Sequence, residues 1–380
     1  MFPEDPRRLV EYGLRFQEQL RQLRQVAAPP DGGWYPYESL SSLTTVAALL
    51  RPVFEEVCPP ARVLDLGCGD GDYSLLFASL GLEVDAVDNA CYNYNGMRGV
   101  RQLARECGVS PGIVDADLDS GWPLADREYG LTLFLGLLYH LKNPYQVLEQ
   151  LAYRTRWCVL STRVAQVTPG NGSRIEEEPV AYLASGMEIN GDATNYWIFS
   201  PAGLRRILQR TRWAILGEAH LGCLSDSNPS DPRKDQRMFV LLKSRVFSNG
   251  LEALPVEGIY GVEDGTWRWT AKHFVLQVIL PLEQHCTGFA LDLYVPQAAV
   301  ERKPVSVTAS IGGAVVGSGS RAAEGTLRLT GTLPETTLHR PVLHISFEVD
   351  NTGLQSGTDG RDLGLCLPLA EGGRLPFTVY

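Results

Sequence analysis

Residues 62–71 of the chain read RVLDLGCGDG, an apolar run that passes directly into a glycine-rich turn. The apolar run predicts a buried strand, and the segment YSLLFASLG that follows it at 73–81 predicts a helix. Gly67 and Gly69 let the backbone bend sharply and let a ligand touch it without meeting a Cβ atom. A strand, a glycine-rich turn and a helix in this order therefore indicate a ligand-binding loop.

Strand-like and helix-like segments alternate from this loop to about residue 245. The expected strands are LEVDAVD at 82–88, GIVDADL at 112–118, LTLFLGLLY at 131–139, WCVLSTRV at 157–164, WAILGEAHL at 213–221 and RMFVLLKSR at 237–245. The expected helices cover 95–108, 144–155 and 200–213. This alternation predicts an α/β fold, a Rossmann-like, doubly wound and mostly parallel sheet over residues 51–245.

The segments on either side of this sheet have their own patterns. Apolar residues at helical spacing predict a helix over 6–27, and a second is expected around 42–57, so residues 1–50 form a helical cap. Residues 170–195 are too long for a plain connection and are expected to form a lid. Short strands separated by turn residues follow from 251 to 380, and they predict an all-β accessory domain, a sandwich or jelly roll.

Composition narrows the class of protein. A chain of 380 residues is longer than one ordinary domain, so two domains are expected. None of its apolar runs reaches the roughly 18–20 residues that would span a membrane. The 34 basic and 44 acidic residues give a net charge of -10, which does not favour nucleic acid as a partner. None of the eight cysteines lies in a CxxC pair, so we expect no metal site and a reducing, cytoplasmic location.

The glycine-rich turn resembles the cofactor loop of class I S-adenosylmethionine-dependent methyltransferases. A dinucleotide fingerprint would place a third glycine at 72, where this chain has aspartate. The resemblance implies that the loop holds the amino-acid part of S-adenosyl-L-methionine, that Asp88 binds the ribose, and that Asp117 and Leu118 contact the adenine. The candidate cofactor-binding residues are Asp65, Gly67, Cys68, Gly69, Gly71, Asp88, Asp117, Leu118 and Gly136.

Three residues near the ends of the fourth and fifth strands are candidates for catalysis: Tyr139, His140 and Arg163. His140 is either a general base, because imidazole titrates near neutral pH, or a residue that orients a loop by hydrogen bonding. Arg163 either binds an anionic group of the substrate or pairs with one of the lid glutamates at 176–178. The candidate substrate-binding residues are Asn195, Tyr196, Trp197 and Arg237.

Residues 60–243 also resemble the bacterial tRNA wobble-uridine carboxymethyltransferases. The similar segments are GLLYHLKNPYQVLEQL at 136–151, NYWIFSPAGLRRILQRT at 195–211 and QRMFVLLKS at 236–244. That family reads the extra carboxylate of carboxy-S-adenosylmethionine with a lysine, a tyrosine and an arginine. Tyr139 and Arg237 match two of them, whereas residues 34–51, where the lysine belongs, contain none.

Three functional hypotheses follow. The first is an enzyme that transfers a methyl group from S-adenosylmethionine to an oxygen or nitrogen of a polar small molecule or glycan. The second is a tRNA-modifying enzyme of the carboxymethyl type, and the third is a non-catalytic protein that binds S-adenosylmethionine. The missing lysine and the acidic charge balance favour the first, with a small-molecule or glycan acceptor and no membrane partner.

Overall fold

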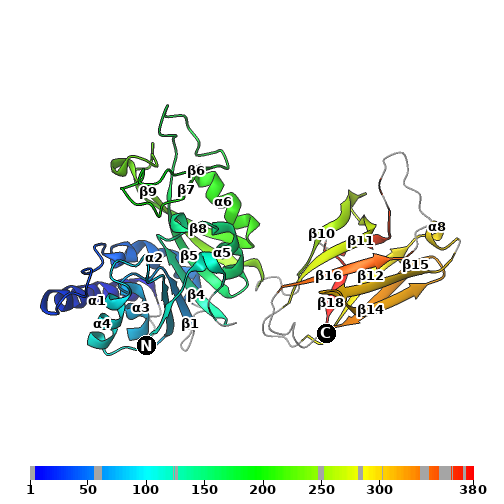
Figure 1. Ribbon diagram of the computed structural model, residues 1–380, viewed down its shortest axis with the longest axis horizontal. Helices are drawn as coiled ribbons and strands as arrows, with labels where there is room; N and C mark the ends of the chain where they lie inside the picture. Colours follow the sequence, from blue (N-terminus) through cyan, green and yellow to red (C-terminus); the bar gives the residue numbers. More distant parts are fainter. Residues whose placement is uncertain are drawn as a thin grey trace. The chain divides into compact units, whose positions relative to one another are not determined.

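The structure is a computed structural model that describes residues 5–54, 62–122, 124, 127–246, 252–280, 286–301, 303–333, 342–350, 361, 363–370 and 374–380. The chain divides into two compact units, Met1–Arg245 and Val246–Tyr380 (Figure 1). Each unit is described by itself below. Within the described residues, no helix is both long and apolar enough to cross a membrane.

The first unit is built on a mixed sheet with the strand order β3-β2-β1-β4-β5. These strands are β1 (Arg62–Leu66), β2 (Glu83–Asp88), β3 (Gly112–Asp115), β4 (Tyr129–Leu135) and β5 (Thr155–Val164). Each pairs with its neighbour in parallel. Beyond β5 the sheet continues antiparallel through β9 (Gln236–Ser244) and β8 (Trp213–Gly222). The predicted Rossmann-like, mostly parallel sheet is confirmed, and its last strand, β9, runs antiparallel to β5.

Helices cover both faces of this sheet because successive strand residues point to opposite sides. The helices are α1 (Pro6–Val26), α2 (Leu43–Leu49), α3 (Asp72–Ser79), α4 (Arg98–Cys107), α5 (Pro144–Ala152) and α6 (Pro201–Arg210). Val63 of β1 packs in a core with side chains of α1 to α4, whereas the next residue, Leu64, packs with α5 and α6. The same alternation separates Leu133 from Phe134 in β4.

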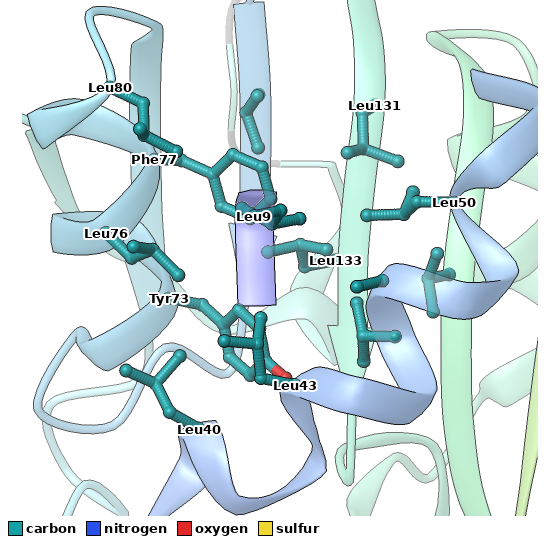
Figure 2. Close-up of a cluster of buried hydrophobic side chains, with 14 of the residues drawn as sticks. Leu9, Leu40, Leu43, Leu50, Tyr73, Leu76, Phe77, Leu80, Leu131 and Leu133 are labelled. Carbon is teal, nitrogen blue, oxygen red and sulfur yellow. The ribbon is translucent and has the colours of Figure 1, made fainter. Parts of the chain in front are cut away.

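The N-terminal helices are integral to the first of these cores. The side chain of Asp5 accepts hydrogen bonds from the first backbone amides of α1, and Pro6 opens the helix. One face of α1 is buried, and its Leu9 lies among side chains from several other elements. Figure 2 shows these neighbours: Leu40, Leu43, Leu50, Tyr73, Leu76, Phe77, Leu80, Leu131 and Leu133.

Several elements end earlier than the sequence pattern predicts: β3 ends at Asp115 instead of Leu118, and α6 ends at Arg210 instead of Trp213. Two further cases have an evident cause. The helix expected over 42–57 ends at Leu49, because Pro52 lacks a backbone N–H and a 3₁₀ turn, Arg51–Val53, replaces the helix there. Residues 55–57 lie outside the described part of the chain. The strand expected through Tyr139 ends at Leu135, because Gly136 has a φ of +74°. A 3₁₀ turn, Leu138–His140, follows it.

The predicted lid, residues 170–195, contains a strand that the sequence pattern did not indicate. It is β6 (Ala181–Leu183), which pairs antiparallel with β7 (Trp197–Phe199). The end of β5 extends past β4, and there Val164 pairs with Phe199 of β7. The segment is thus tied to the carboxyl edge of the sheet, where ligands bind in open α/β folds.

The second unit is all-β, as predicted, and its strands form one closed sheet. The strands in the described part of this unit are β10 (Glu252–Glu263), β11 (Trp267–Ile279), β12 (Gly288–Val295), β13 (Val305–Ile311), β14 (Ala314–Arg321), β15 (Gly325–Thr332), β16 (Val342–Val349), β17 (Cys366–Pro368) and β18 (Phe377–Val379), and a short helix, α8 (Gln297–Val300), follows β12. The order is β10-β11-β16-β13-β14-β15-β12-β17, and β17 also pairs with β11. That additional pairing closes the sheet into a barrel-like form. Phe274, Phe289 and Phe347 lie in its core.

The first unit is expected to fold and bind its ligand without the second. Each unit has its own hydrophobic core, which is the mark of an independently folding domain. A protein truncated after Arg245 should therefore unfold cooperatively and bind S-adenosylmethionine, the cofactor that the resemblance implies, within about threefold of the full chain's affinity. Circular dichroism and calorimetry measure both properties. An aggregated or unfolded truncation would show that the second unit is needed for the first.

Candidate functional site

A cavity of about 730 Å³ lies at the carboxyl ends of β1, β2, β4 and β5. Its volume is within the range of about 300–1,000 Å³ that is typical of ligand and cofactor sites. Fourteen of the candidate residues line it: Asp65, Gly67, Cys68, Gly69, Asp88, Asp117, Leu118, Gly136, Tyr139, His140, Arg163, Asn195, Tyr196 and Arg237. The two other candidates, Gly71 and Trp197, are not among the lining residues.

The glycine-rich turn forms one wall of the cavity. Gly67 and Gly69 have φ angles of +73° and +59°, a conformation that strains any residue with a side chain. A Cβ atom on Gly69 would lie 3.3 Å from the ring of Tyr35, and one on Gly67 would lie 3.2 Å from Leu137. Gly71 has a packing role instead. It precedes α3, and a Cβ atom there would come within 2.4 Å of Val100.

Asp88, at the end of β2, holds the turn in place. Its Oδ2 accepts hydrogen bonds from the Gly69 amide, at 2.8 Å, and from Nδ2 of Asn93, at 2.9 Å. Its Oδ1 accepts one from the Asn89 amide, at 2.8 Å. Burial raises the pKa of Asp88, and these hydrogen bonds oppose the effect. A carboxylate has about four acceptor sites, so one remains for a hydroxyl group in the cavity.

Asp65, the aspartate of β1, is buried beside this turn. The Ser74 hydroxyl donates to its Oδ2 at 2.5 Å, and the side chain is almost inaccessible to solvent. Burial raises the pKa of Asp65 to about 7, although the hydrogen bond from Ser74 works in the opposite direction. The folded protein therefore holds a proton on Asp65 at pH values where the unfolded chain has lost it.

This raised pKa predicts how stability depends on pH. Between the usual value of 3.8 and about 7, the folded state binds the extra proton, so the contribution of Asp65 to stability falls as pH rises. The slope approaches about 1.4 kcal/mol per pH unit at most. Asp65→Asn should remove this pH dependence. In denaturant unfolding without ligand, the free energy of unfolding of the variant should therefore rise relative to that of wild type from pH 4 to pH 8. A pH-independent difference, like that expected for Asp31→Asn on an exposed loop, would contradict the prediction.

Asp117 and Leu118 lie where β3 leads into a 3₁₀ turn. Asp117 accepts hydrogen bonds from the Asp119 amide, at 3.0 Å, and from the Ser120 hydroxyl, at 2.8 Å, so both of its oxygens are engaged locally. Leu118 is buried, with 8% of its surface exposed. Both residues line the cavity beyond Asp88, because β3 is the neighbour of β2.

The 3₁₀ turn after β4 presents Tyr139 and His140 to the cavity. The Tyr139 hydroxyl lies 3.7 Å from the position that a Cβ atom on Gly136 would take. Burial raises the pKa of Tyr139, while the charges of Arg237 and Arg163 lower it. The rings of Tyr139 and His140 have their centroids 4.3 Å apart.

His140 is oriented by the lid segment. Its Nδ1 lies 2.8 Å from the hydroxyl oxygen of Thr194 and 3.2 Å from the backbone carbonyl oxygen of the same residue. A carbonyl oxygen only accepts hydrogen bonds, so Nδ1 carries the proton and the neutral ring keeps its free lone pair on Nε2. The Thr194 hydroxyl donates in turn to Asp192 at 2.6 Å. This arrangement fixes both the ring and its tautomer.

Electrostatics keep this imidazole neutral. Burial lowers the pKa of His140, and the nearby Asp192 carboxylate raises it by less than burial lowers it. A neutral imidazole with Nε2 unprotonated can accept a proton from a ligand in the cavity.

Arg163 on β5 and Arg237 on β9 form the wall of the cavity away from the glycine-rich turn, called the far wall below. Nε of Arg163 donates to Oδ1 of Asp235 at 2.6 Å, so the partner is Asp235 and none of the lid glutamates. Arg237 lies directly opposite Arg163 in the β5–β9 register. Both arginines line the cavity.

The remaining substrate candidates lie at the junction of the lid and β7. Asn195 is buried, and its Nδ2 donates to the carbonyl oxygen of Asp192 at 3.1 Å. Tyr196 lines the cavity, with Nζ of Lys142 5.8 Å from the centre of its ring. Trp197 begins β7, and its Nε1 donates to the carbonyl oxygen of Lys142 at 3.3 Å. Asn195 and Tyr196 therefore reach the cavity, and Trp197 supports the wall.

Several lining residues were not singled out by the sequence pattern: Tyr35, Tyr37, Asn89, Asn93, Asp192, Thr194 and Asp235. The aromatic segment WYPYESL at 34–40 was the available signal for the tyrosines. The Tyr35 amide donates to Asp70 at 2.8 Å, and this bond brings that segment onto the glycine-rich turn. Asp192, Thr194 and Asp235 lie in loops whose place is set by distant strands.

Comparison with known proteins gives one family and a set of solved structures. Residues 17–216 match the sequence model of a family described as a methyltransferase domain. The fold is similar to that of the N-terminal domain of EvdMO1 with SAH bound, at 17% identity and a TM-score of 0.40, covering 60% of this chain and 96% of that one. A SAM-dependent methyltransferase from Methanosarcina mazei gives 16% identity and a TM-score of 0.38, covering 51% and 98%. The [4+2]-cyclase SpnF gives 14% identity and a TM-score of 0.38, covering 62% of this chain and 96% of that one. No curated protein gives a sequence match.

Proposed function

The chain belongs to the methyltransferase domain family, whose methyl donor is S-adenosyl-L-methionine, and on that premise we propose that it methylates an oxygen or nitrogen of a polar small molecule or glycan. The observation that carries the proposal is one cavity lined by the glycine-rich turn and Asp88 on one side and by His140, Arg163 and Arg237 on the other. The first group suits a cofactor, and the second suits a polar acceptor.

The residues at β1 to β3 fit S-adenosylmethionine. Gly67 and Gly69 leave backbone exposed where a Cβ atom would crowd Leu137 or Tyr35, so the turn can take the amino-acid part of the cofactor. Asp88 keeps an acceptor site for a ribose hydroxyl. Leu118 supplies an apolar surface for the adenine. We assign Asp65 and Gly71 to holding this loop and Gly136 to the methionine end. When bound, the cofactor supplies a methyl group that is already activated by its sulfonium.

His140 acts as the general base in this proposal. The acceptor oxygen or nitrogen would bond to the methyl carbon as the bond from that carbon to the sulfonium sulfur breaks, S-adenosylhomocysteine would leave, and the acceptor's proton would pass to Nε2 of His140. Thr194 and Asp192 hold the ring with Nδ1 protonated, so Nε2 keeps a free lone pair that can accept the proton. Tyr139 and Arg163 orient the acceptor, and Asn195 and Tyr196 border it.

A second candidate is carboxymethyl transfer from carboxy-S-adenosylmethionine. Tyr139 and Arg237 line the same cavity, and the charge of Arg237 lowers the pKa of Tyr139. A carboxylate between them would meet a positive charge and a hydroxyl donor. Against it, residues 34–51 contain no lysine, although this segment supplies Tyr35 and Tyr37 to the cavity. Cys68, Cys91, Cys107, Cys158, Cys223 and Cys366 are free thiols, which supports a reducing, cytoplasmic location.

Mass spectrometry of the small molecules released from the purified, denatured protein tests the assignment. S-adenosylmethionine or S-adenosylhomocysteine is the expected result. The heavier carboxylated cofactor would promote the second candidate. Incubation with methyl-labelled S-adenosylmethionine and polar metabolite fractions then tests catalysis, because transfer of label to any acceptor excludes a protein that only binds the cofactor. A protein that neither carries nor binds S-adenosylhomocysteine would overturn the proposal.

A further inference from the structure

The two arginines of the far wall stand in an arrangement that needs an anion. Arg163 and Arg237 are directly opposite each other on the antiparallel pair β5–β9, so their side chains leave the same face of the sheet. Like charges in this position repel, and their juxtaposition is unfavourable unless a negative group lies between or beside them. Asp235 supplies one negative charge, through its ion pair with Arg163. One positive charge is left without a counterpart.

Arg163 is buried and only partly satisfied. Its side chain is 5% exposed, and Nε is the atom bound to Asp235. Its Nη1 is buried without a hydrogen-bond partner anywhere in the described part of the chain. A buried guanidinium that leaves a donor unused is costly, and such groups mark positions where a ligand completes the hydrogen bonding.

Arg237 is the uncompensated charge. Its side chain is exposed to the cavity, and among the described residues it makes neither an ion pair nor a hydrogen bond. Its charge is nevertheless close to two tyrosines: burial raises the pKa of Tyr35 and of Tyr139, and Arg237 opposes both effects. Two phenol hydroxyls and a free guanidinium therefore face the same space.

We propose that Arg163 and Arg237 form a subsite for a carboxylate carried by the methyl acceptor. The inference rests on the proposed function and narrows its substrate class to acidic molecules. The acceptor is the preferred source of the carboxylate because β4 separates β5 from β1, so the subsite begins two strand spacings, about 10 Å, from the glycine-rich turn. A carboxylate held by Arg163 and Arg237 would leave the remainder of the acceptor beside His140, which lies on the turn after β4.

The experiment uses malonate as a probe carboxylate and malonamide as its neutral counterpart. The full-length protein is first titrated with S-adenosylhomocysteine, and malonate is then titrated into the saturated complex by calorimetry. We expect malonate to bind and malonamide not to bind. Arg237→Gln should weaken malonate at least about tenfold, because a charge-assisted contact is lost, while S-adenosylhomocysteine affinity stays within about twofold. Arg233→Gln is the matched control, since Arg233 lies in the turn just before β9, is 89% exposed and does not line the cavity.

Asp235→Asn separates this subsite from a purely structural ion pair. Removing the carboxylate leaves Arg163 in place with its charge uncompensated, so malonate should bind several-fold more tightly. If Asp235 and Arg163 only stabilise the fold, the variant should lose thermal stability with malonate affinity unchanged or lower.

Besides that outcome for Asp235→Asn, three results would overturn the inference. One is a complex with S-adenosylhomocysteine that does not bind malonate, and another is malonate affinity that Arg237→Gln leaves unchanged. The third is a wild-type protein that binds carboxy-S-adenosylmethionine more tightly than S-adenosylmethionine and loses that preference in Arg237→Gln, which would assign the carboxylate to the cofactor. Failure to bind S-adenosylhomocysteine in the first titration would instead count against the proposed function itself.

Discussion

Gly69→Arg is expected to weaken the binding of S-adenosylhomocysteine at least about a thousandfold, a loss of about 4 kcal/mol. Gly69 has a φ of +59° and lines the cavity, and even a Cβ atom there would press on the ring of Tyr35 at 3.3 Å. A longer side chain must then extend into the space that the cofactor needs. Calorimetry on the purified variant measures the affinity, and circular dichroism measures whether it is folded.

Gly108→Arg is the matched control for this variant. Gly108 has a similar φ of +67°, so the same backbone strain is introduced, but it ends α4 and a Cβ atom there meets nothing within 4 Å. We expect similar losses of thermal stability in both variants, with cofactor binding lost only in Gly69→Arg. A folded Gly69→Arg protein that binds with undiminished affinity would remove the glycine-rich turn from the cofactor site.

His140→Asn is expected to lower kcat by about 100-fold or more, within the range of about 10²–10⁴ that general base catalysis contributes. The asparagine amide can still donate to Thr194, as Nδ1 of the histidine does, so the lid contact is kept while the lone pair of Nε2 is lost. S-adenosylhomocysteine affinity should change little, because the proposed function assigns His140 to the acceptor and not to the cofactor. Steady-state kinetics with a labelled methyl donor measures the effect once an acceptor is in hand.

The pH profile gives the second readout for His140. Burial lowers its pKa below the usual 6.5, so wild-type kcat/KM should stay high through neutral pH and fall only when the medium is acid enough to protonate the ring. His140→Asn should lack this acid limb. Thr194→Val, which removes the hydroxyl that positions the ring, should give a smaller loss and keep the limb. If His140→Asn retains both wild-type kcat and the acid limb, the histidine only orients the loop.

The parallel sheet and the glycine-rich turn could be predicted because their signals are local. An apolar run such as Val63-Leu64 predicts a buried strand whichever helix covers it. Gly67 and Gly69 predict a turn from a few neighbouring residues alone. The end of β4 was harder to predict. The apolar run continues through Leu137 and Leu138, and a single glycine, Gly136, decides where the strand stops.

The partners of the catalytic candidates could not be predicted, because they are far away in the sequence. His140 meets Thr194 across 54 residues, and Arg163 meets Asp235 across 72. Each partner is an ordinary polar residue in a loop, and its position is set by strand pairings formed elsewhere, such as Val164 with Phe199. In the second unit, β14 carries little strand signal in its own sequence. Its sequence, AVVGSGSR, is rich in glycine and serine, and it is held in the sheet by its neighbours more than by its own strand propensity.

The closing pair of the second unit has a kinetic consequence. The hairpin β13–β14 joins Ile311 to Ala314 across two glycines, whereas β11–β17 joins Trp269 to Cys366 at nearly the opposite ends of the unit. Loop entropy rises by about 0.6 kcal/mol for each doubling of loop length, so bringing these ends together costs about 3 kcal/mol more than closing the hairpin. We therefore expect the hairpins to form early, because their loops are short, and the non-local pairing of β11 with β17 to form late.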